Sequence, residues 1–582
     1  MFHALNTRCG HYALLLTAAV ALTFPNLGAC SLWDIDEGNN AEAAREMLDC
    51  GNWVVPTHNY QLRVDKPALL YWLQISAFGL FGINEFAARL PSALAALAAV
   101  LMTYELGRRM FGAATGLLAG LVLATTGLFC AAAHFANPDA LLNAATLLTL
   151  FFFWRTFSRP LPLPLSSTAA DQGRGRERAW SVASGISAGV AVLAKGPVGL
   201  VLPVAIIGLF LLWSRKARLL WEWRLLGAAL AFVLVAVPWY VWVGVETKIA
   251  FLNGFILQHN IGRYLHPMEH HSGPVFYYLG VLALGFAPWS VFLGLAGWYA
   301  TGKRAREDDP PSARLSFQPA AEWTEGRRPG LPAGYRFLWC WIAVTFGFFS
   351  LASTKLPNYI LPLYPPLAIL TAHFLQRWRA GTIRPPAWVL HLSIAGFALV
   401  GVATSLALLI AAGTIPIPAL HGFPLAGLRT WAALGIVPVL GAAAAWRCLY
   451  TGHRSGLVLC VTVASIAFIG GLFTWGSVAL DAYKAPRALV QTGKVQQTDR
   501  EIRVGCYQYF QPSLVFYCRR EVRRLENDEQ VLEFLRSPLP TYLFLPATVW
   551  ERLQTSVRGA HHLLARHSDL YRRCEVVIVA NH

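Results

Sequence analysis

The sequence has few charged residues and lacks the short motifs of soluble enzymes. Asp, Glu, Lys and Arg make up 14% of its 582 residues, whereas 55% are hydrophobic. A composition this apolar excludes an ordinary water-soluble protein, because it leaves too little polar surface to cover a core. No Cys-x-x-Cys pair occurs among the 10 cysteines, which excludes a zinc knuckle and a dithiol redox motif. A glycine-rich phosphate loop is also missing, so we expect no nucleotide site.

The hydrophobic residues form runs that are long enough to cross a membrane. Runs such as Ala13–Ala29, Ala114–Ala133 and Leu225–Val245 match the roughly 18 residues or more that a helix needs to cross a hydrocarbon layer about 30 Å thick. We count about thirteen such spans along the chain. An odd number places the two termini on opposite sides of the bilayer. The sequence therefore predicts a mainly α-helical, multi-pass membrane protein whose partners include membrane lipids.

The net charge of +17 does not indicate a nucleic-acid partner. Lys and Arg are spread over short loops such as Gly107–Phe111, Ser214–Arg224 and Arg377–Arg384, and basic loops of this kind face the cytoplasm. Two longer basic loops, Leu161–Arg178 and Lys303–Gly334, are typical of solvated linkers. This orientation predicts a protein of the cytoplasmic (inner) membrane, with its remaining loops and its C-terminal part on the periplasmic side.

Two regions on the predicted outer side are more than connections. Residues 31–85 contain Glu37–Leu48 at helical spacing and Pro67–Phe81, an apolar segment too short to span and therefore expected to lie along the interface as a helix. After residue 480 the apolar spans stop, and residues 481–582 alternate strand-like and helical runs. The expected strands are Arg503–Tyr509, Leu514–Cys518, Thr541–Leu545 and Cys574–Ala580, and the expected helices are Glu529–Arg536 and Thr548–Val557. We therefore predict a transmembrane domain over residues 1–480 and a small soluble α/β domain over 481–582.

Ionisable side chains collect on this outer side, in five separate segments of the chain. They are Asp34, Asp36, Glu37, Asp65, Lys66, Asp139, Lys195, His259, Arg263 and Lys355. Each has an ordinary explanation when taken alone: an acid favours the N-terminus of a helix, and a lone lysine often reaches out to the interface. The histidines near His259 are either a solvated loop or a metal site. Because charges near a membrane interior usually serve function, five segments on one face predict a polar, electropositive pocket.

Several sequence blocks between residues 30 and 370 occur in an order that is typical of one family. They are Asp36-Glu37-Gly-Asn-Asn-Ala-Glu42, Asp65-Lys66-Pro67, Ala88-Arg89-Leu90-Pro91-Ser92, Asn137-Pro138-Asp139, Ala194-Lys195-Gly196-Pro197, His259 through Arg263-Tyr264, and Thr354-Lys355-Leu356-Pro357-Asn-Tyr359. With these blocks the chain resembles the ArnT-like glycosyltransferases of the dolichyl-phosphate-mannose protein mannosyltransferase superfamily (glycosyltransferase family 39/83 type). The resemblance implies the GT-C membrane fold. Two blocks depart from the family pattern: Asp65-Lys66-Pro67-Ala68 replaces the usual Glu-Lys-Pro-Pro, and Asn39-Asn40-Ala41-Glu42 replaces a frequent Arg-Tyr-Ala-Glu.

The resemblance also implies a reaction and a set of site residues. The donor is a sugar on a polyprenyl (undecaprenyl) phosphate, and transfer inverts the anomeric carbon; the best-known member of the family attaches aminoarabinose to lipid A. The implied catalytic residues are Asp36 and Asp139, with Glu37 and Asn40 on the acceptor side. The implied ligands of the donor phosphate are Lys66, Arg263, Lys355 and Tyr359. A divalent metal ion, for which zinc suits the mixed oxygen and nitrogen ligands, is expected between Asp65 and His259.

Other functions remain open on the sequence alone. The acceptor is a lipid A-like molecule, or a protein or polysaccharide if the family member differs in specificity. A membrane lipid flippase or transporter is a rival from another class, but it predicts charges at mid-membrane depth and inverted repeats. Here the charges follow the ends of spans on one face. A scaffold without activity leaves their clustering unexplained, so the sequence favours a glycosyltransferase.

Overall fold

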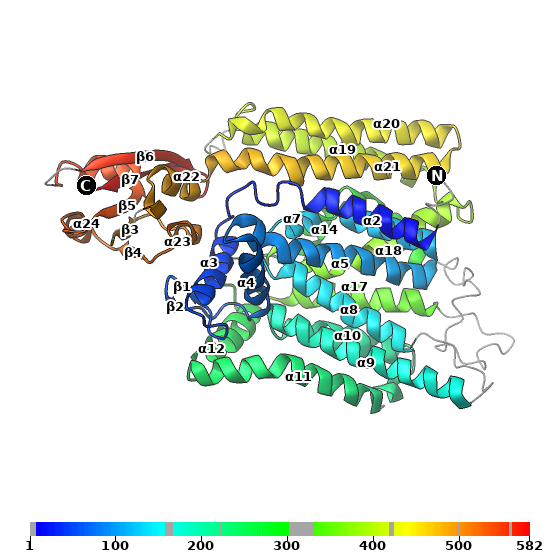
Figure 1. Ribbon diagram of the computed structural model, residues 1–582. Coiled ribbons are helices and arrows are strands. Elements are labelled where there is room, and N and C mark those ends of the chain that lie inside the picture. Colours follow the sequence, from blue (N-terminus) through cyan, green and yellow to red (C-terminus); the bar gives the residue numbers. More distant parts are fainter. Residues whose placement is uncertain are drawn as a thin grey trace.

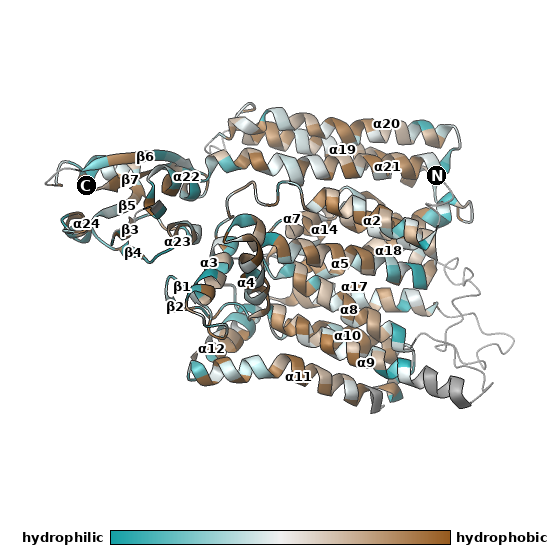
Figure 2. Cartoon of the chain, in the orientation of Figure 1, coloured by the Kyte–Doolittle hydropathy of each residue, from teal (hydrophilic) through white to brown (hydrophobic). Residues whose placement is uncertain are grey.

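The computed structural model describes residues 7–157, 167–221, 223–268, 271–301, 331–417, 424–497, 501–557 and 561–581. A bundle of roughly parallel and antiparallel helices makes up most of the chain, and a smaller unit built on a β-sheet lies beyond one end of it (Figure 1). Hydrophobic residues dominate the long helices, while hydrophilic residues gather at the ends (Figure 2).

The helices of the bundle follow the predicted apolar runs. In chain order they are α2 (Arg8–Thr23), α5 (Glu85–Phe111), α6 (Ala113–Ala124), α7 (Gly127–Ala133), α8 (Asp139–Phe157), α9 (Ser167–Lys195), α10 (Val198–Trp213), α11 (Trp223–Glu246), α14 (Tyr277–Gly285), α15 (Leu293–Thr301), α17 (Ala333–Leu351), α18 (Tyr364–Arg379), α19 (Ala387–Ala411), α20 (Ile436–Tyr450) and α21 (Arg454–Ile469). Their ends carry the expected signals. For example, Asn84 caps α5 by accepting a hydrogen bond from the Ala87 N–H (2.9 Å), and Gly112, at φ +99°, ends it.

Six helical segments of the described chain are long and apolar enough to cross a membrane. They are Glu85–Phe111, Leu225–Glu246, Ala333–Leu351, Ala387–Ala411, Ala426–Tyr450 and Arg454–Tyr483. Two bent pairs, α6 with α7 (69°) and α14 with Trp289–Thr301 (112°), raise the number to eight if each is one span. The chain is therefore a multi-pass membrane protein. Apolar helices such as α10 are shorter than 18 residues, so the larger number of about thirteen spans stays a prediction.

One of the predicted linkers is partly helical. Helix α9 begins at Ser167, so the second half of Leu161–Arg178 continues the helix that ends at Lys195. Alanine, glutamine, glutamate and arginine in this stretch favour helix once a long apolar helix follows them. The preceding residues 161–166 and most of the other predicted linker, residues 303–330, lie outside the described part of the chain.

Short elements form a layer at one end of the bundle (Figure 1). They are helices α3 (Asp36–Asp49), α4 (Leu69–Phe81), α12 (Ala250–Leu252) and α13 (Arg263–Leu265), the hairpin β1 (Thr57–His58) and β2 (Gln61–Leu62), the π-helix η2 (Asn253–Gly262) and the 3₁₀-helix η6 (Pro357–Leu363). Both helices predicted in the first outer loop are present as α3 and α4. Helix α4 buries Leu70, Tyr71 and Phe78, whereas Leu80 is 78% exposed.

The C-terminal part folds around a five-stranded mixed sheet with the order β4-β3-β5-β7-β6. Strand β3 pairs in parallel with β4 and β5, and β7 pairs antiparallel with β5 and β6. The strands are β3 (Arg503–Tyr507), β4 (Val522–Leu525), β5 (Thr541–Pro546), β6 (His562–Asp569) and β7 (Cys574–Ala580), and the helices are α22 (Ala485–Thr492), α23 (Pro512–Cys518), α24 (Asp528–Leu535) and α25 (Ala547–Leu553). The predicted α/β class is confirmed.

Three details of this part differ from the prediction. The segment Leu514–Cys518, predicted as a strand, is helical as part of α23, because Pro512 sits in its first turn and Arg519 closes it in the left-handed conformation. A short buried apolar run has no periodicity that separates strand from helix. Strands β4 and β6 were not predicted, because their Arg and His residues hide the alternation of two edge strands.

The C-terminal part is fixed to the first outer loop by buried polar contacts. The Ser513 N–H donates to Asp34 Oδ1 (2.7 Å), and the Ser513 hydroxyl donates to Asp34 Oδ2. The Lys484 ammonium donates to the Ser31 carbonyl (2.6 Å) and lies 4.0 Å from the centre of the Trp33 ring. These contacts hold the sheet next to helix α3 and hence next to the end of the bundle where the predicted site residues lie.

The Asp34 contact predicts a pH-dependent stability. Burial raises the pKa of Asp34 to about 7, above its ordinary value of 3.8. A carboxyl with a raised pKa stabilises the folded state below its unfolded pKa and loses that contribution as the pH rises through the folded pKa. We therefore expect the melting temperature of the purified protein in detergent to fall between about pH 4 and about pH 7.

The variant Asp34→Asn removes this titration but keeps an oxygen for Ser513, so its melting temperature should depend less on pH. Asp569, whose pKa burial also raises, is unchanged in the variant, so the difference between the two proteins reports Asp34. Identical pH profiles for the two proteins would contradict the prediction.

Candidate functional site

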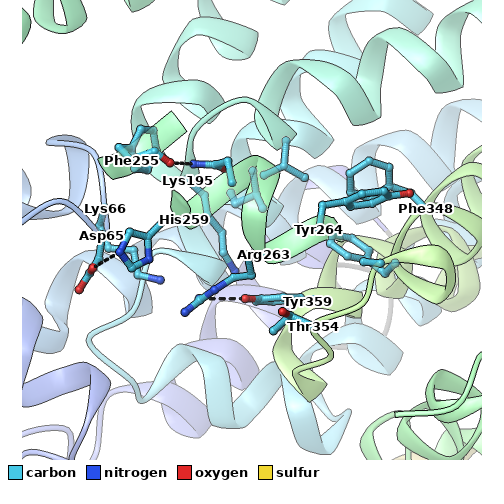
Figure 3. A pocket seen from close by; sticks show the side chains of 15 residues that line it. Asp65, Lys66, Lys195, Phe255, His259, Arg263, Tyr264, Phe348, Thr354 and Tyr359 are labelled. Atoms are coloured by element: carbon cyan, nitrogen blue, oxygen red, sulfur yellow. Dashed lines mark hydrogen bonds and ion pairs between the residues drawn. The ribbon is translucent and has the colours of Figure 1, made fainter. Parts of the chain in front are cut away.

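A pocket with a volume of about 110 Å³ lies where five segments of the chain meet (Figure 3). Its walls come from the loop before α4, from α8, from the α9–α10 turn, from η2 and α13, and from the segment between α17 and η6. The ionisable residues that line it are Asp65, Lys66, Lys195, His259, Arg263 and Tyr359, joined by Tyr264. The structure therefore brings together outer segments that the sequence separates by almost 300 residues.

Lys195 reaches this pocket because helix α9 stops at it. Gly196 adopts φ +88° and its N–H donates to the Val192 carbonyl (2.7 Å), which is a glycine helix end. A Cβ atom on Gly196 would approach the Phe255 ring to 2.5 Å. Glycine is therefore required both for the turn and for the close approach of η2, and Pro197 after it begins the next helix.

Asp139 holds Lys195 in place. The Lys195 ammonium forms an ion pair with Asp139 Oδ1, and Asn358 donates to Asp139 Oδ2 (2.6 Å). Asp139 is 3% exposed and starts α8, where its charge also favours the helix N-terminus. The Lys195 ammonium lies 4.4 Å from the centre of the Tyr359 ring. Asp139 thus positions Lys195 and Asn358, and its expected catalytic role stays a prediction.

A π-helix and the short α-helix after it each carry one of the next two site residues. Helix η2 has the wide turns of i→i+5 hydrogen bonding, and the Asn260 side chain donates to the Phe255 carbonyl (2.7 Å) five residues before it. His259 lies in η2, and Arg263 follows directly in α13. Arg263 Nη1 donates to the Tyr359 hydroxyl oxygen (3.2 Å; Figure 3). The Tyr359 hydroxyl can still donate its own hydrogen into the pocket.

Asp65 and His259 form the pair for which a metal ion is expected. Asp65 Oδ1 and His259 Nε2 are 3.1 Å apart (Figure 3). Two ligands on one tetrahedral zinc ion, with bonds of about 2.0 Å, are roughly 3.3 Å apart, so the pair fits one edge of such a site. No cluster of three or more His, Cys, Asp or Glu residues able to hold a metal occurs among the described residues, so any further ligands have to come from elsewhere.

Lys66 is the cation of the pocket that has no counter-charge of its own. Within the described residues it forms no ion pair, whereas Lys195 is paired with Asp139. The pocket wall carries three cations, Lys66, Lys195 and Arg263, against the single carboxylate of Asp65. This balance suits an anionic ligand, because fixed cations with few hydrogen-bond partners attract phosphate.

The predicted acceptor side lies at the start of α3. Asp36 is solvent-exposed and accepts a hydrogen bond from Asn137 Nδ2 (3.3 Å). Glu37 and Asn40, also predicted on the acceptor side, are both 0% exposed. Asn40 Nδ2 donates to the Ala136 carbonyl (2.9 Å). These two side chains therefore support the site from within, and their role toward an acceptor stays a prediction.

Glu37 is the centre of a buried network. Arg89 donates to both of its carboxylate oxygens (2.9 and 2.7 Å), and the N–H groups of Trp33 (2.7 Å) and Ala136 (2.6 Å) donate to it as well. Arg89 in turn donates to the carbonyls of Leu27, Cys30 and Ser31. One ion pair thus fastens the first loop, helix α5 and the segment before α8 to one another.

Lys355 was predicted as a phosphate ligand, and this role stays a prediction. It is 5% exposed and does not line the pocket. Its ammonium donates to the carbonyls of Ser350 and Ala352 (2.8 Å each), where α17 ends. Its N–H donates to the His271 carbonyl (2.9 Å). Lys355 therefore caps a helix C-terminus and ties two loops together, as cations often do at that position.

Two site residues were not predicted. Arg63 is 6% exposed, lies 3.4 Å from Asp65 in an ion pair, and donates to the Asn40 side chain (3.2 Å) and to the Tyr71 hydroxyl (3.1 Å). Asn358 holds Asp139, as described above. Arg63 lies two residues before Asp65, but an arginine in a polar loop gives no sequence sign of burial. Asn358 lies in the block Thr354–Tyr359, but an uncharged amide gives little sequence sign of a role in a site.

Comparisons with known proteins agree with this geometry. Residues 10–253 match the family described as dolichyl-phosphate-mannose-protein mannosyltransferase. An undecaprenyl phosphate-alpha-4-amino-4-deoxy-L-arabinose arabinosyl transferase of Pseudomonas aeruginosa is 32% identical over 372 residues, which are 63% of this chain and 60% of that protein. The apo crystal structure of ArnT from Cupriavidus metallidurans has a TM-score of 0.73 at 25% identity and covers 99% of this chain and 98% of that one. Residues 10–253, less than half of the chain, therefore match this family, and the whole chain is similar in fold to ArnT.

The similarity is more complete in structure than in sequence. An uncharacterized protein of Aquifex aeolicus is 28% identical over 63% of this chain and 64% of its own length, so the chain matches less than two thirds of these curated relatives. ArnT from Cupriavidus metallidurans bound to undecaprenyl phosphate has a TM-score of 0.75 at 24% identity and covers 99% of both chains. The ArnT-like fold therefore extends along this chain as a whole.

The Glu37–Arg89 pair predicts a large loss of stability on truncation. Arg89→Ala leaves the Glu37 carboxylate buried without a counter-charge, and breaking a buried pair in this way costs about 3–5 kcal/mol. We expect a strongly lowered melting temperature in detergent. Arg108→Ala is the matched control, because Arg108 is 26% exposed and pairs with Glu105 at the other end of α5. That loss should be about 1 kcal/mol or less; equal losses in the two variants would contradict the structural role of Arg89.

Proposed function

We propose that this protein transfers a sugar from a polyprenyl-phosphate-linked donor to an acceptor outside the cytoplasm. The observation that carries the proposal is the convergence of Lys66, Lys195 and Arg263 on one small pocket. These cations come from three distant segments, and the Tyr359 hydroxyl lies among them. A relative named for an undecaprenyl phosphate sugar and a similar structure bound to undecaprenyl phosphate support the choice of donor.

The cations suit a phosphate that leaves from an anomeric carbon. As the bond between that carbon and the phosphate oxygen breaks, negative charge grows on the phosphate. Lys66 and Arg263 are proposed to contact this phosphate, and the Tyr359 hydroxyl donates to it. Lys195, fixed by Asp139, adds a third positive charge nearby. Cations that are held in place before the reaction stabilise the transition state, in which this charge has grown, more than they stabilise the ground state. This difference accelerates the reaction.

Asp36 is the proposed catalytic group on the acceptor side. It is exposed at the start of α3 and oriented by Asn137. If the acceptor is a hydroxyl, its oxygen forms the new bond to the anomeric carbon, its proton passes to the Asp36 carboxylate, and the polyprenyl phosphate leaves with the electron pair. If the acceptor is a phosphate, no proton has to be removed and Asp36 positions it. Attack opposite the leaving phosphate inverts the anomeric carbon.

The same site fits a divalent metal ion. Asp65 and His259 would hold it, and Arg63 orients Asp65 through their ion pair. A divalent ion there would supply positive charge beside the donor phosphate. The residues Lys66, Arg263 and Tyr359 carry out the binding described above whichever ion is present.

The likeness to ArnT also supports finer proposals. We propose a GT-C arrangement of about thirteen spans, an orientation that places the pocket and the C-terminal sheet on the periplasmic side of the inner membrane, and a lipid A-like glycolipid as acceptor. Helix α3, the β1–β2 hairpin and the C-terminal sheet all lie at one end of the bundle (Figure 1). Asp65 and Lys66, which line the pocket, follow this hairpin in the chain, as a site served from one side of the membrane requires.

The proposal predicts that Lys66 is needed to bind the donor phosphate. We expect Lys66→Ala to weaken binding of undecaprenyl phosphate to the purified protein about tenfold or more, because a hydrogen bond to a charged group contributes about 1.5–3 kcal/mol. Lys248→Ala is the control, since Lys248 is an exposed lysine in the turn after α11 and does not line the pocket. Equal affinities of wild type and Lys66→Ala would exclude this pocket as the donor site.

Asp36→Asn separates binding from transfer. It should bind undecaprenyl phosphate as the wild type does, and lower the rate of sugar transfer to lipid A by about 10²-fold or more if the acceptor is a hydroxyl. Transfer is measured with undecaprenyl-phosphate aminoarabinose as donor and mass spectrometry of the lipid A. A normal rate for Asp36→Asn would contradict its role as the base.

A further inference from the structure

Two larger cavities continue from the donor pocket toward the C-terminal sheet. The first, about 480 Å³, lies between the β1–β2 hairpin and strand β4, and the second, about 540 Å³, lies between the start of α3 and the C-terminal part. Asn39 and Arg524 line both cavities. Asp65 lines the first cavity and also the donor pocket. We call the two cavities together the interdomain groove.

The groove is lined by residues next to Asp36 on helix α3, although Asp36 does not line either cavity itself. Asn39 follows Asp36 by three residues in α3, so the two side chains lie on the same face of the helix, one turn apart. Arg63 lines the groove and donates to Asn40. A molecule in the groove therefore lies one helical turn from Asp36, beside Asn39, and contacts Asp65, which also lines the donor pocket.

Two arginines of strand β4 give the groove its anion-binding character. Arg523 and Arg524 are exposed, and within the described residues neither forms an ion pair. Arg63, by contrast, is buried and paired with Asp65. His58 adds no charge at neutral pH, because burial and the neighbouring Arg63 and Arg524 lower its pKa to about 4.

Arg524 is held ready for a ligand. Its guanidinium lies 3.5 Å from the centre of the Phe510 ring, and such stacking orients the planar group without using its N–H donors. A guanidinium fixed in this way presents paired donors, which match two oxygens of one phosphate.

We propose that the interdomain groove is the acceptor site and that Arg523 and Arg524 bind the phosphate of an anionic, phosphate-bearing sugar headgroup. The inference rests on the proposed glycosyltransferase function. It gives the C-terminal part a direct role: β4 completes the acceptor site, and the contacts of Asp34 and Lys484 hold β4 over α3. The headgroup is either that of a membrane glycolipid or a free phosphorylated glycan, since both offer the same phosphate to the arginines.

The test compares binding to the full-length protein in detergent. Diphosphorylated lipid A and its fully dephosphorylated form are the probes, and the variant carries both Arg523→Gln and Arg524→Gln. We expect the double variant to bind diphosphorylated lipid A at least about tenfold more weakly, and the wild type to prefer the phosphorylated form by a similar factor. Arg552→Gln is the control, because Arg552 is an exposed arginine of the same part that pairs with Asp528 and does not line the groove.

A competition experiment separates the two sources of the headgroup. If glucosamine 1-phosphate displaces lipid A from the wild type, the sugar phosphate alone is recognised. If it does not displace lipid A, but lipid A binding still depends on Arg523 and Arg524, the ligand is a membrane lipid. Both results support the interdomain groove as the acceptor site. The proposal is overturned if lipid A binds equally well without its phosphates or without both arginines. It is also overturned if an unphosphorylated protein acceptor binds preferentially in the groove.

Undecaprenyl phosphate binding distinguishes this failure from failure of the proposed function. The double variant should bind undecaprenyl phosphate with wild-type affinity and melt at the wild-type temperature, because both arginines are exposed. Normal donor binding with arginine-independent lipid A binding overturns the acceptor site alone. A wild-type protein that does not bind undecaprenyl phosphate overturns the proposed function, and with it this inference.

Discussion

The buried ion pair between Glu37 and Arg89 is the contact on which the outer end of the bundle depends. It joins the first loop, helix α5 and the segment before α8 through hydrogen bonds that leave neither side chain exposed. Asp36 precedes Glu37 directly, and Asp139 lies three residues after Ala136, which donates to the same carboxylate. The ion pair therefore sets the distance between the exposed acid of the acceptor side and the acid that holds Lys195. Removing either partner leaves a buried charge unpaired, which is far more costly than losing an exposed pair.

Pairing also decides which cations can serve a ligand. Lys195 is neutralised by Asp139, Lys355 donates to carbonyls at the end of α17, and Arg63 is paired with Asp65. Lys66 in the donor pocket is left without a counter-charge in the described chain, as are Arg523 and Arg524 in the interdomain groove. The two sets of cations line different cavities, which share Asp65. The proposed lipid-borne phosphate and the proposed acceptor phosphate therefore have separate places. This division follows from the contacts and is not visible in the net charge of +17.

Much of this architecture is predictable from the sequence, for physical reasons. Apolar runs fix the long helices, the Gly196-Pro197 pair fixes the break after Lys195, and the grouping of charges at span ends predicts their convergence. The sequence does not show which charges are buried. Glu37, Asn40 and Lys355, predicted to contact substrates, are all buried in backbone or ion-pair contacts that depend on tertiary packing, and their roles toward substrates stay predictions. For the same reason a buried apolar run was predicted as a strand where α23 forms, and the polar edge strand β4, which supplies Arg523 and Arg524, was not predicted.

An experimental structure of the protein with bound undecaprenyl phosphate tests the central claim most directly. The convergence of distant segments on one lipid-borne phosphate predicts that its oxygens lie within hydrogen-bond distance of Lys66 and Arg263, with the Tyr359 hydroxyl in contact, and that its tail runs along the bundle. A phosphate found away from Lys66 and Arg263, for instance at mid-depth between the helices, would contradict the account.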